Sequence, residues 1–343
     1  SISQKEKNNI IQACLSGEIQ FIIGTHSLIQ DSVKFKRLGL SIIDEQHKFG
    51  VEQRLKLVRK SPGSHCLIMS ATPIPRSLSL TQFGDLDIST ITSLPGGRKG
   101  CKTRIVTPEN FGNFLNFIQT RIEMREQAYI VVPAITDNPK QDMLNLEDVL
   151  KKFHHFFPMF KIKGLHGQLK STEKSSTIES FKKNETQILI ATSVIEVGIN
   201  ITNATIMTIM NPERFGLSSL HQLRGRVGRG DKPGFCFLVN DGKISNESVA
   251  RLRVIEQNTD GFKIAEVDLK LRGPGNIMGT QQSGVLNLKI ADVVKDSAVL
   301  HKARQVAINV LENDANLSNP ENAILFKIYT QIQKTSGLWS NIS

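Results

Sequence analysis

Aromatic side chains are scarce in this chain of 343 residues, at 6% with one tryptophan and two tyrosines. Stacking of nucleic-acid bases on aromatic platforms is therefore not expected to dominate any binding. Cysteines are also few, and no two of them stand at the spacing of a metal-binding or redox motif: Cys14, Cys66, Cys101 and Cys236. The sequence thus predicts no zinc site and a reducing, cytoplasmic setting.

Three further features are missing. No apolar run is long enough to span a bilayer, and no secretory leader stands at the N-terminus. The first residue is not methionine, so we expect the chain to begin inside a longer gene product. The pattern Gly-x-x-x-x-Gly-Lys-[Ser/Thr] occurs nowhere, so these 343 residues contain no phosphate-binding loop of that type.

Positive charge is in excess: 43 lysines and arginines against 32 acidic residues give a net charge of +11. This excess favours a polyanionic partner, with nucleic acid first. Since aromatics are few, phosphate contact is the expected mode of binding, and it should weaken steeply with salt. The length of 343 residues is enough for two domains and a small appendage, and the hydrophobic content of 39% is sufficient for packed cores.

Apolar β-rich runs alternate with helical patterns along most of the chain, which predicts parallel sheets with crossover helices. Strands are predicted first at residues 19–23, 40–43 and 66–69. After a glycine-rich segment at 93–100, they are predicted at 104–106, 129–132, 161–165, 188–191, 206–209 and 235–239. Helices are expected at 110–124 and 172–182, further helices beyond 241, and a last helix that begins at Asn319-Pro320.

The predicted fold class is therefore α/β, with two parallel-sheet lobes of which the first is incomplete. We place the first lobe at residues 1–95, a hinge at 96–102 and the second lobe at 103–240. Residues 241–343 are expected to form a helical hairpin and C-terminal helices.

The most informative stretch is residues 221–230, which read His-Gln-Leu-Arg-Gly-Arg-Val-Gly-Arg-Gly. If Ser218 or Ser219 caps a helix, then Gln222, Arg226 and Arg229 share one stripe of it. The opposite stripe is apolar and expected to be buried: Leu220, Leu223 and Val227. Because arginine suits bidentate phosphate contact, this predicts a contact with a nucleotide triphosphate. The alternative is a basic helix end on solvent or on DNA backbone.

Two glycines stand inside this stretch, Gly225 and Gly228. A glycine costs about 1 kcal/mol relative to alanine in a helix interior. Their presence indicates that something approaches the backbone closely there.

An acidic pair follows the predicted strand 40–43, in the order Asp44-Glu45-Gln46-His47. Ligands of open α/β sheets bind outside the carboxyl ends of strands. Asp44 can hold Mg²⁺ through water there, and Glu45 can orient an attacking water. The alternative is a strand that leads into an ordinary polar turn.

Small polar groups follow other predicted strands. Ser70 and Thr72 can hydrogen-bond a neighbouring carboxylate loop, or form an ordinary turn. Thr192 and Ser193 can cap a short helix whose N-terminus meets a phosphate of DNA or nucleotide, or act as plain caps. Two further turns can track a nucleic-acid backbone, or hold structural histidines: Gly24-Thr25-His26 and Leu165-His166-Gly167.

Together and in this order, these segments resemble motifs Ic, II, III, V and VI of superfamily 2 helicases. Residues 44–54, 71–76 and 83–87 are similar to the RecG family of bacterial ATP-dependent DNA helicases. Residues 261–275 and 279–284 resemble the translocation motif shared by that family and the transcription-repair coupling factor. Residues 193–198 and 272–275 favour the RecG family, and the resemblance covers essentially the whole chain.

The resemblance implies RecA-like lobes and a role for each matching residue. Nucleotide contacts and hydrolysis would involve Asp44, Glu45, His47, Gly198, Gln222, Arg226 and Arg229. Asp44 and Glu45 would hold Mg²⁺ through water. Coupling to DNA movement would involve Ser70, Thr72, Arg251 and Gln282. DNA contacts would involve Gly24, Thr25, His26, His166 and Thr192.

The resemblance also implies an activity, with ATP and Mg²⁺ as cofactors. Such an enzyme is a double-stranded DNA translocase that regresses forks and migrates Holliday junctions in replication restart and recombination. Its partners would be forks, Holliday junctions, and D-loops or R-loops. We expect a monomer without membrane contact, in the bacterial cytoplasm at the nucleoid.

The chain also departs from the family pattern. The nucleotide-binding first half and the N-terminal wedge domain are absent, so we expect a C-terminal portion that binds DNA without hydrolysing ATP alone. Thr202 replaces a usual proline, and Gln281 replaces a usual basic residue. Gly97 and Gly100 replace proline in the hinge and should loosen it. A third hypothesis is that the protein is a transcription-repair coupling factor. An RNA-polymerase-binding domain encoded upstream would support this hypothesis.

Overall fold

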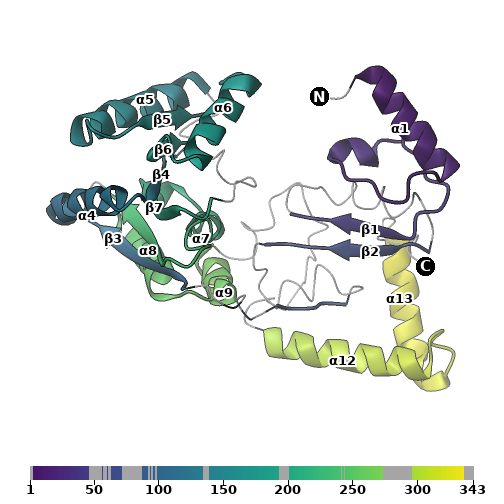
Figure 1. The fold of residues 1–343 in the computed structure, drawn as a ribbon. Helices are drawn as coiled ribbons and strands as arrows, with labels where there is room; N and C mark the ends of the chain where they lie inside the picture. The colour runs from purple at the N-terminus through teal and green to yellow at the C-terminus, as the bar shows by residue number, and fades with distance from the viewer. Residues whose placement is uncertain are drawn as a thin grey trace. The chain divides into compact units, whose positions relative to one another are not determined.

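The computed structural model describes residues 3–45, 56, 60, 63–71, 87–91, 93, 96, 99–133, 139–192, 201–240, 242, 244–272 and 296–335. The chain forms two compact units, residues 1–74 with 90–284 and residues 75–89 with 285–343. Within the described residues the elements are helices and parallel strands (Figure 1).

The N-terminal part begins with helix α1, Gln4–Ser16, whose start is fixed by a capping box. The backbone N–H of Glu6 donates to Ser3 Oγ at 3.3 Å, and the Ser3 N–H donates to the Glu6 carboxylate at 2.8 Å. Helix η1 covers His26–Ile29. Strands β1, Leu40–Ile43, and β2, His65–Ile68, then form a parallel pair in which Ile43 is opposite Ile68.

The predicted strand at 19–23 is wrong. Within the described part of the chain it pairs with no strand, and Phe21 and Ile23 are 77% and 83% exposed. An apolar run becomes a strand only where a neighbour receives its backbone hydrogen bonds, and composition does not reveal that neighbour.

The second sheet has six parallel strands in the order β3-β8-β7-β4-β6-β5. Their bounds are Cys101–Val106 for β3, Gln127–Val131 for β4, Ile162–Leu165 for β5, Ile188–Ala191 for β6, Ala204–Met210 for β7 and Gly234–Val239 for β8. Every residue of β4 and β6 is buried, as in sheets covered on both faces. All of these strands, as well as β1 and β2, were predicted within a few residues.

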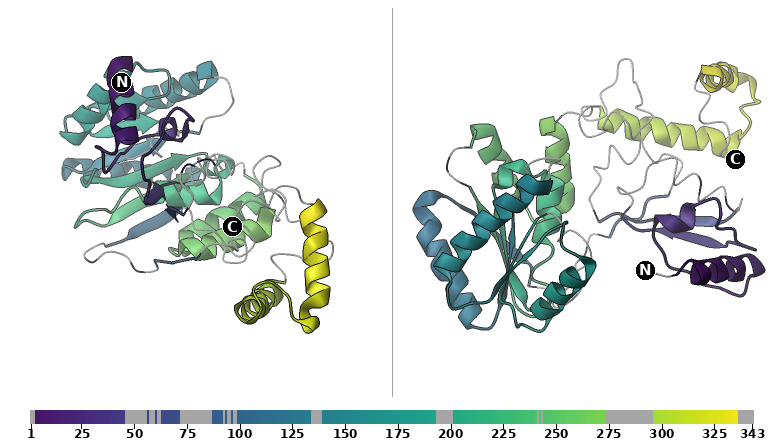
Figure 2. Two further views of the ribbon diagram at one scale, coloured as in Figure 1. Left: turned by 90° about the vertical axis from the view of Figure 1, so that its right-hand side faces the viewer. Right: turned by 90° about the horizontal axis from the view of Figure 1, so that it is seen from above.

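Helices cover both faces of this sheet (Figure 2). Helices α4, Phe111–Glu123, and α5, Pro139–Phe156, pack on one face through Phe114, Ile118 and Phe153. The other face is covered by α6, α7, α8 and α9, which span Ser171–Lys182, Leu217–Arg224, Asn246–Gln257 and Gly261–Arg272. The α/β fold class and the predicted helices at 110–124 and 172–182 are confirmed.

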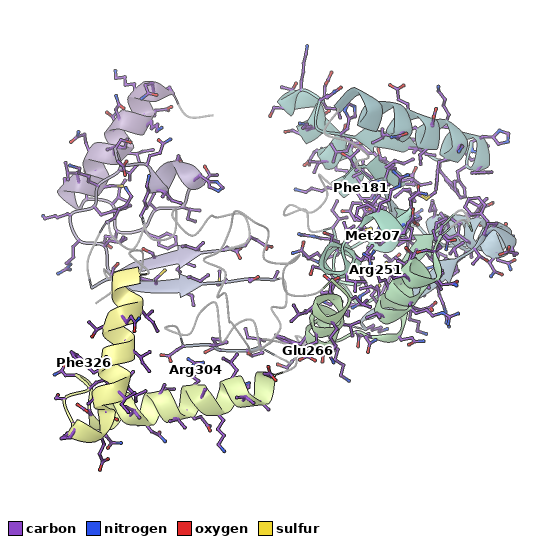
Figure 3. All side chains as sticks on the ribbon, turned by 180° about the vertical axis from the view of Figure 1, so that it is seen from behind. Phe181, Met207, Arg251, Glu266, Arg304 and Phe326 are labelled. Atoms are coloured by element: carbon purple, nitrogen blue, oxygen red, sulfur yellow. The ribbon has the colours of Figure 1, made fainter. Side chains whose placement is uncertain are left out.

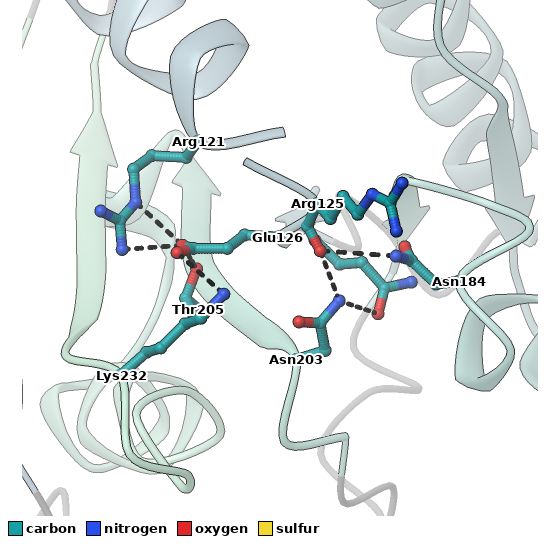
Figure 4. A network of polar contacts seen from close by, with 8 residues as sticks. Arg121, Arg125, Glu126, Asn184, Asn203, Thr205 and Lys232 are labelled. Atoms are coloured by element: carbon teal, nitrogen blue, oxygen red, sulfur yellow. Dashed lines mark hydrogen bonds and ion pairs between the residues drawn. The ribbon is translucent and has the colours of Figure 1, made fainter. Parts of the chain in front are cut away.

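A buried carboxylate fixes the amino end of the sheet (Figure 4). Glu126, 3% exposed, stands just before β4 and pairs with Arg121 Nη2 at 2.8 Å and with Lys232 Nζ at 3.4 Å. The Thr205 hydroxyl of β7 donates to the same carboxylate. These partners compensate the negative charge of the buried Glu126 carboxylate. Through them, Glu126 links α4, β7 and the segment before β8.

The last helices are α12, Ser297–Asn313, and α13, Ala323–Thr335, with the short helix η6, Pro320–Asn322, between them. Asn319 precedes Pro320 at the start of η6, which confirms the predicted position of the final helical start. Among the described helices, none combines the length and apolar character needed to cross a membrane.

Candidate functional site

The arginine-bearing segment is only partly helical. Helix α7 ends at Arg224 and is followed by Gly225, so Arg226 and Arg229 lie beyond it. The predicted stripe of Gln222, Arg226 and Arg229 on one helix is therefore wrong, as is the cap at Ser218 or Ser219, since the N-cap is Gly216. The predicted burial of the apolar set is confirmed for Leu220, Leu223 and Val227.

Gly228, in the segment after α7, has a backbone conformation that is not helical. Its φ of +70° lies in the left-handed region, which glycine adopts without steric cost. A Cβ atom there would lie 2.7 Å from the Gly100 carbonyl oxygen and 3.0 Å from the Gly234 nitrogen. The Gly234 N–H itself donates to the Gly100 carbonyl at 2.9 Å. The predicted close approach is thus confirmed at Gly228, whereas at Gly225 the nearest atoms are carbonyls of its own last helical turn.

Residues 225–230 consequently lie beside the amino ends of three strands. Gly100 precedes β3, Gly234 begins β8, and Thr202, which lies beside Gly230, precedes β7. The Arg229 Nε donates to the Gly225 carbonyl at 3.0 Å, which folds the side chain back over the turn.

Tyr129 of β4 lies near both arginines. Burial raises the pKa of the Tyr129 phenol, and the positive charges of Arg226 and Arg229 partly offset this rise. The Tyr129 side chain is fully buried. The ring itself packs on Phe181 of α6, with 5.0 Å between the ring centroids.

The acidic pair lies at the carboxyl end of β1. Asp44 is exposed, and the Glu45 N–H donates to Asp44 Oδ1 at 2.8 Å, with Glu45 at a φ of +53°. Ser70 follows β2, and since β1 and β2 are parallel, Ser70 and the acidic pair share one edge. His47 and Thr72 lie outside the described residues.

The predicted DNA-contacting residues fall into two groups. His166 follows β5 and Thr192 follows β6, and these neighbouring strands bring them to the same carboxyl edge, where the Thr192 N–H donates to the Leu165 carbonyl at 3.3 Å. This edge is opposite to the one that carries residues 225–230. Gly24, Thr25 and His26 lie in the N-terminal part, at the start of η1.

Arg251 of α8, labelled in Figure 3, forms a hydrogen bond just before the start of α7. Its Nη2 donates to the Phe215 carbonyl at 3.0 Å, one residue before the N-cap of α7. The neighbouring Glu256 accepts the Ile105 N–H of β3 at 3.0 Å, so α8 is also tied to the sheet. Gly198 and Gln282 lie outside the described residues.

The sequence interpretation missed Arg224, which is only 4% exposed. Its Nη1 donates to the carbonyls of Ile255 at 2.8 Å and Asn258 at 2.6 Å, and its Nη2 donates to Thr259 at 3.3 Å. The same Nη2 lies 2.8 Å from His221 Nδ1. Three arginines occur in six residues, and their spacing alone does not show which of them is buried.

Burial lowers the pKa of His221 to about 4, with the Arg224 charge as the second cause. His221 is therefore neutral at physiological pH, and its Nδ1 can accept the hydrogen bond from Arg224. Burial also lowers the pKa of Arg224, but arginine remains charged.

Three family profiles match the chain in succession. Residues 1–81 match the DEAD/DEAH box helicase profile, and residues 110–231 match the helicase conserved C-terminal domain. Residues 258–343 match the profile described as ATP-dependent DNA helicase RecG, domain 3, C-terminal. The arginine-bearing segment thus ends the second profile, and the third begins at the turn between α8 and α9.

Curated relatives match almost the full length of the chain. It is 44% identical to the ATP-dependent DNA helicase RecG of Bacillus subtilis over 326 residues, which cover 95% of the chain and 48% of the relative. It is 46% identical to the same enzyme of Synechocystis, with 96% and 40% covered. The chain therefore spans about half the length of the curated relatives it matches or less.

A solved structure described as RecG bound to a three-way DNA junction is also similar. The match has a TM-score of 0.64 at 40% sequence identity, and covers 87% of this chain and 38% of that one. The lobes described above therefore have the RecA-like fold of helicases.

Proposed function

The chain is homologous to the bacterial RecG helicases along the part of them that it spans, and we propose that its gene product is an ATP-driven motor of this family acting on branched DNA. The observation that carries the proposal is the RecG profile matched at residues 258–343, which follows a helicase C-terminal domain matched at residues 110–231. The same profile favours this function over a transcription-repair coupling factor.

The residues present fit ATP and Mg²⁺ as cofactors. Asp44 and Glu45 offer the carboxylate oxygens that Mg²⁺ prefers, at the carboxyl end of a parallel strand. Arg226 and Arg229 offer planar donors suited to phosphate, on a turn held by backbone contacts. When bound, ATP with Mg²⁺ supplies the phosphoanhydride whose hydrolysis drives the motor. We assign water orientation to Glu45 and γ-phosphate contact to Gln222, Arg226 and Arg229.

The proposed partner is branched double-stranded DNA, including forks, Holliday junctions and D-loops or R-loops. The net charge of +11 and the strand-end pair His166 and Thr192 support contact with the phosphate backbone. A relative described as bound to a three-way junction supports the choice of branched DNA. We propose that the protein acts as a monomer in the bacterial cytoplasm at the nucleoid.

The test is ATP hydrolysis by the complete gene product in the presence of a three-way junction or a linear duplex of equal length. We expect the junction to stimulate hydrolysis at least tenfold more than the duplex. The isolated 343-residue chain, which has no Gly-x-x-x-x-Gly-Lys-[Ser/Thr] pattern, should bind the junction without hydrolysing ATP. A complete gene product that shows no DNA-stimulated hydrolysis would refute the proposed function.

A further inference from the structure

Arg224 is a buried cation whose charge is compensated without a carboxylate. Among the described residues no acidic side chain forms an ion pair with its guanidinium, although the side chain is only 4% exposed. Burying an unpaired charge is costly, so its surroundings must provide other compensation. That compensation comes from three backbone carbonyls and one imidazole.

The three carbonyls belong to one structural feature. Ile255 lies in the last turn of α8, and Asn258 and Thr259 form the link from α8 to α9. The last carbonyls of a helix carry partial negative charge and lack partners within the helix. Arg224 therefore caps α8, and the two terminal nitrogens of its planar fork reach separate acceptors, whereas a lysine offers a single nitrogen.

Helix α7 is consequently held to α8 at both ends. At its start Arg251 of α8 donates to the Phe215 carbonyl, and at its end Arg224 donates back to the end of α8. Helix α7 also packs against α9. The turn that carries Arg226 and Arg229 follows Arg224 directly, so the contacts of Arg224 fix the start of that turn to the end of α8.

The contact between Arg224 and the α8–α9 link joins two parts of the chain that match different family profiles. Arg224 belongs to the matched helicase C-terminal domain, 110–231, whereas Asn258 is the first residue matched by the RecG-specific profile. His221 contributes from the α7 side, where its neutral imidazole lies 2.8 Å from Arg224 Nη2.

We infer that Arg224 is a positioning residue: it makes the Arg226–Arg229 turn and the α8–α9 pair move as one body, and so couples ATP hydrolysis to DNA movement. This inference rests on the proposed function. Arg224 itself contacts neither nucleotide nor DNA in this proposal. It acts through the backbone of the α8–α9 link.

The test compares Arg224→Met and Arg224→Lys in the complete gene product. The readout is the number of junctions migrated per ATP hydrolysed, together with kcat and KM for DNA-stimulated hydrolysis. Arg224→Met should lower the junctions migrated per ATP at least tenfold, while kcat falls less than threefold. Arg224→Lys, which keeps the charge but can satisfy fewer carbonyls, should give an intermediate ratio.

Arg121→Met is the matched control, because it removes another partly buried arginine from the same lobe, the one paired with Glu126. It should lose stability without a change in junctions migrated per ATP. The inference is overturned if the ratio for Arg224→Met stays within twofold of wild type, or if Arg121→Met lowers it equally. If Arg224→Met does not fold, a wild-type ratio for Arg224→Lys overturns it. Absence of hydrolysis by the wild-type protein is a different result, since it refutes the proposed function itself.

Discussion

Replacing Arg229 by alanine is expected to reduce DNA-stimulated ATP hydrolysis by the complete gene product by about 10³-fold or more, with binding of a three-way junction retained. Arginines that stabilise the transition state of phosphoryl transfer contribute roughly 10³–10⁵ in rate. The Arg229 Nε is anchored on the Gly225 carbonyl, so the orientation of this guanidinium is set by the turn that carries it. Steady-state hydrolysis with saturating junction DNA measures the effect.

Two control variants separate this role from general charge. Arg229→Lys keeps the charge but loses the planar fork, and should remain close to the alanine variant in rate. Arg104→Ala removes an exposed arginine from the edge strand β3 and should hydrolyse ATP normally. Normal turnover by Arg229→Ala would remove Arg229 from the proposed nucleotide site.

Replacing Gly228 by alanine is expected to lower the free energy of unfolding by about 3 kcal/mol. A left-handed conformation costs a non-glycine residue roughly 1–2 kcal/mol, and overpacking typically adds about 1–3 kcal/mol. Both apply here, because φ is +70° and the new Cβ would lie 2.7 Å from the Gly100 carbonyl oxygen. Urea unfolding of the 343-residue chain measures the change.

Gly112→Ala is the opposite case. Gly112 lies in the first turn of helix α4 with nothing within 4 Å of its missing Cβ, so alanine should stabilise by about 0.4–1 kcal/mol, chiefly by restricting the unfolded chain. Because Gly228→Ala displaces the arginine turn, it should also abolish hydrolysis in the complete gene product. Equal stabilities for the two variants would contradict the packing described for Gly228.

Strands were the most predictable part of the fold. The fully buried strands β4 and β6 stand out as short apolar runs, and β1 was predicted at its observed bounds. The run at 19–23 is similarly apolar but pairs with no strand in the described part of the chain. Apolar content reports burial potential, whereas strand formation also requires a pairing partner elsewhere in the sequence.

The end of α7 shows a second limit. The spacing of Gln222, Arg226 and Arg229 suits a helix, but α7 ends at Arg224, and Gly228 further on takes a left-handed conformation against Gly100, more than a hundred residues earlier. The burial of Arg224 similarly depends on the α8–α9 link, a feature of tertiary structure. The sequence pattern therefore located the arginine segment but could not assign the part played by each arginine.

The strand-end positions were predictable for a physical reason. Parallel strands bring their carboxyl ends to one edge, so residues that follow neighbouring strands meet, as His166 and Thr192 do. The pairing order that makes β5 and β6 neighbours came from the structure. The nucleotide and DNA roles of these residues stay predictions.

We propose that guanidinium groups of the second lobe complete a nucleotide site begun by the acidic pair of the first. The most direct test uses an ATP analogue with a photoreactive group on its γ-phosphate, bound to the complete gene product with Mg²⁺ and a three-way junction. After illumination and proteolysis, we expect the label on the peptide that contains Arg226 and Arg229, and loss of that label in Arg229→Ala. Labelling that never reaches this peptide, although the analogue is bound, would contradict the claim.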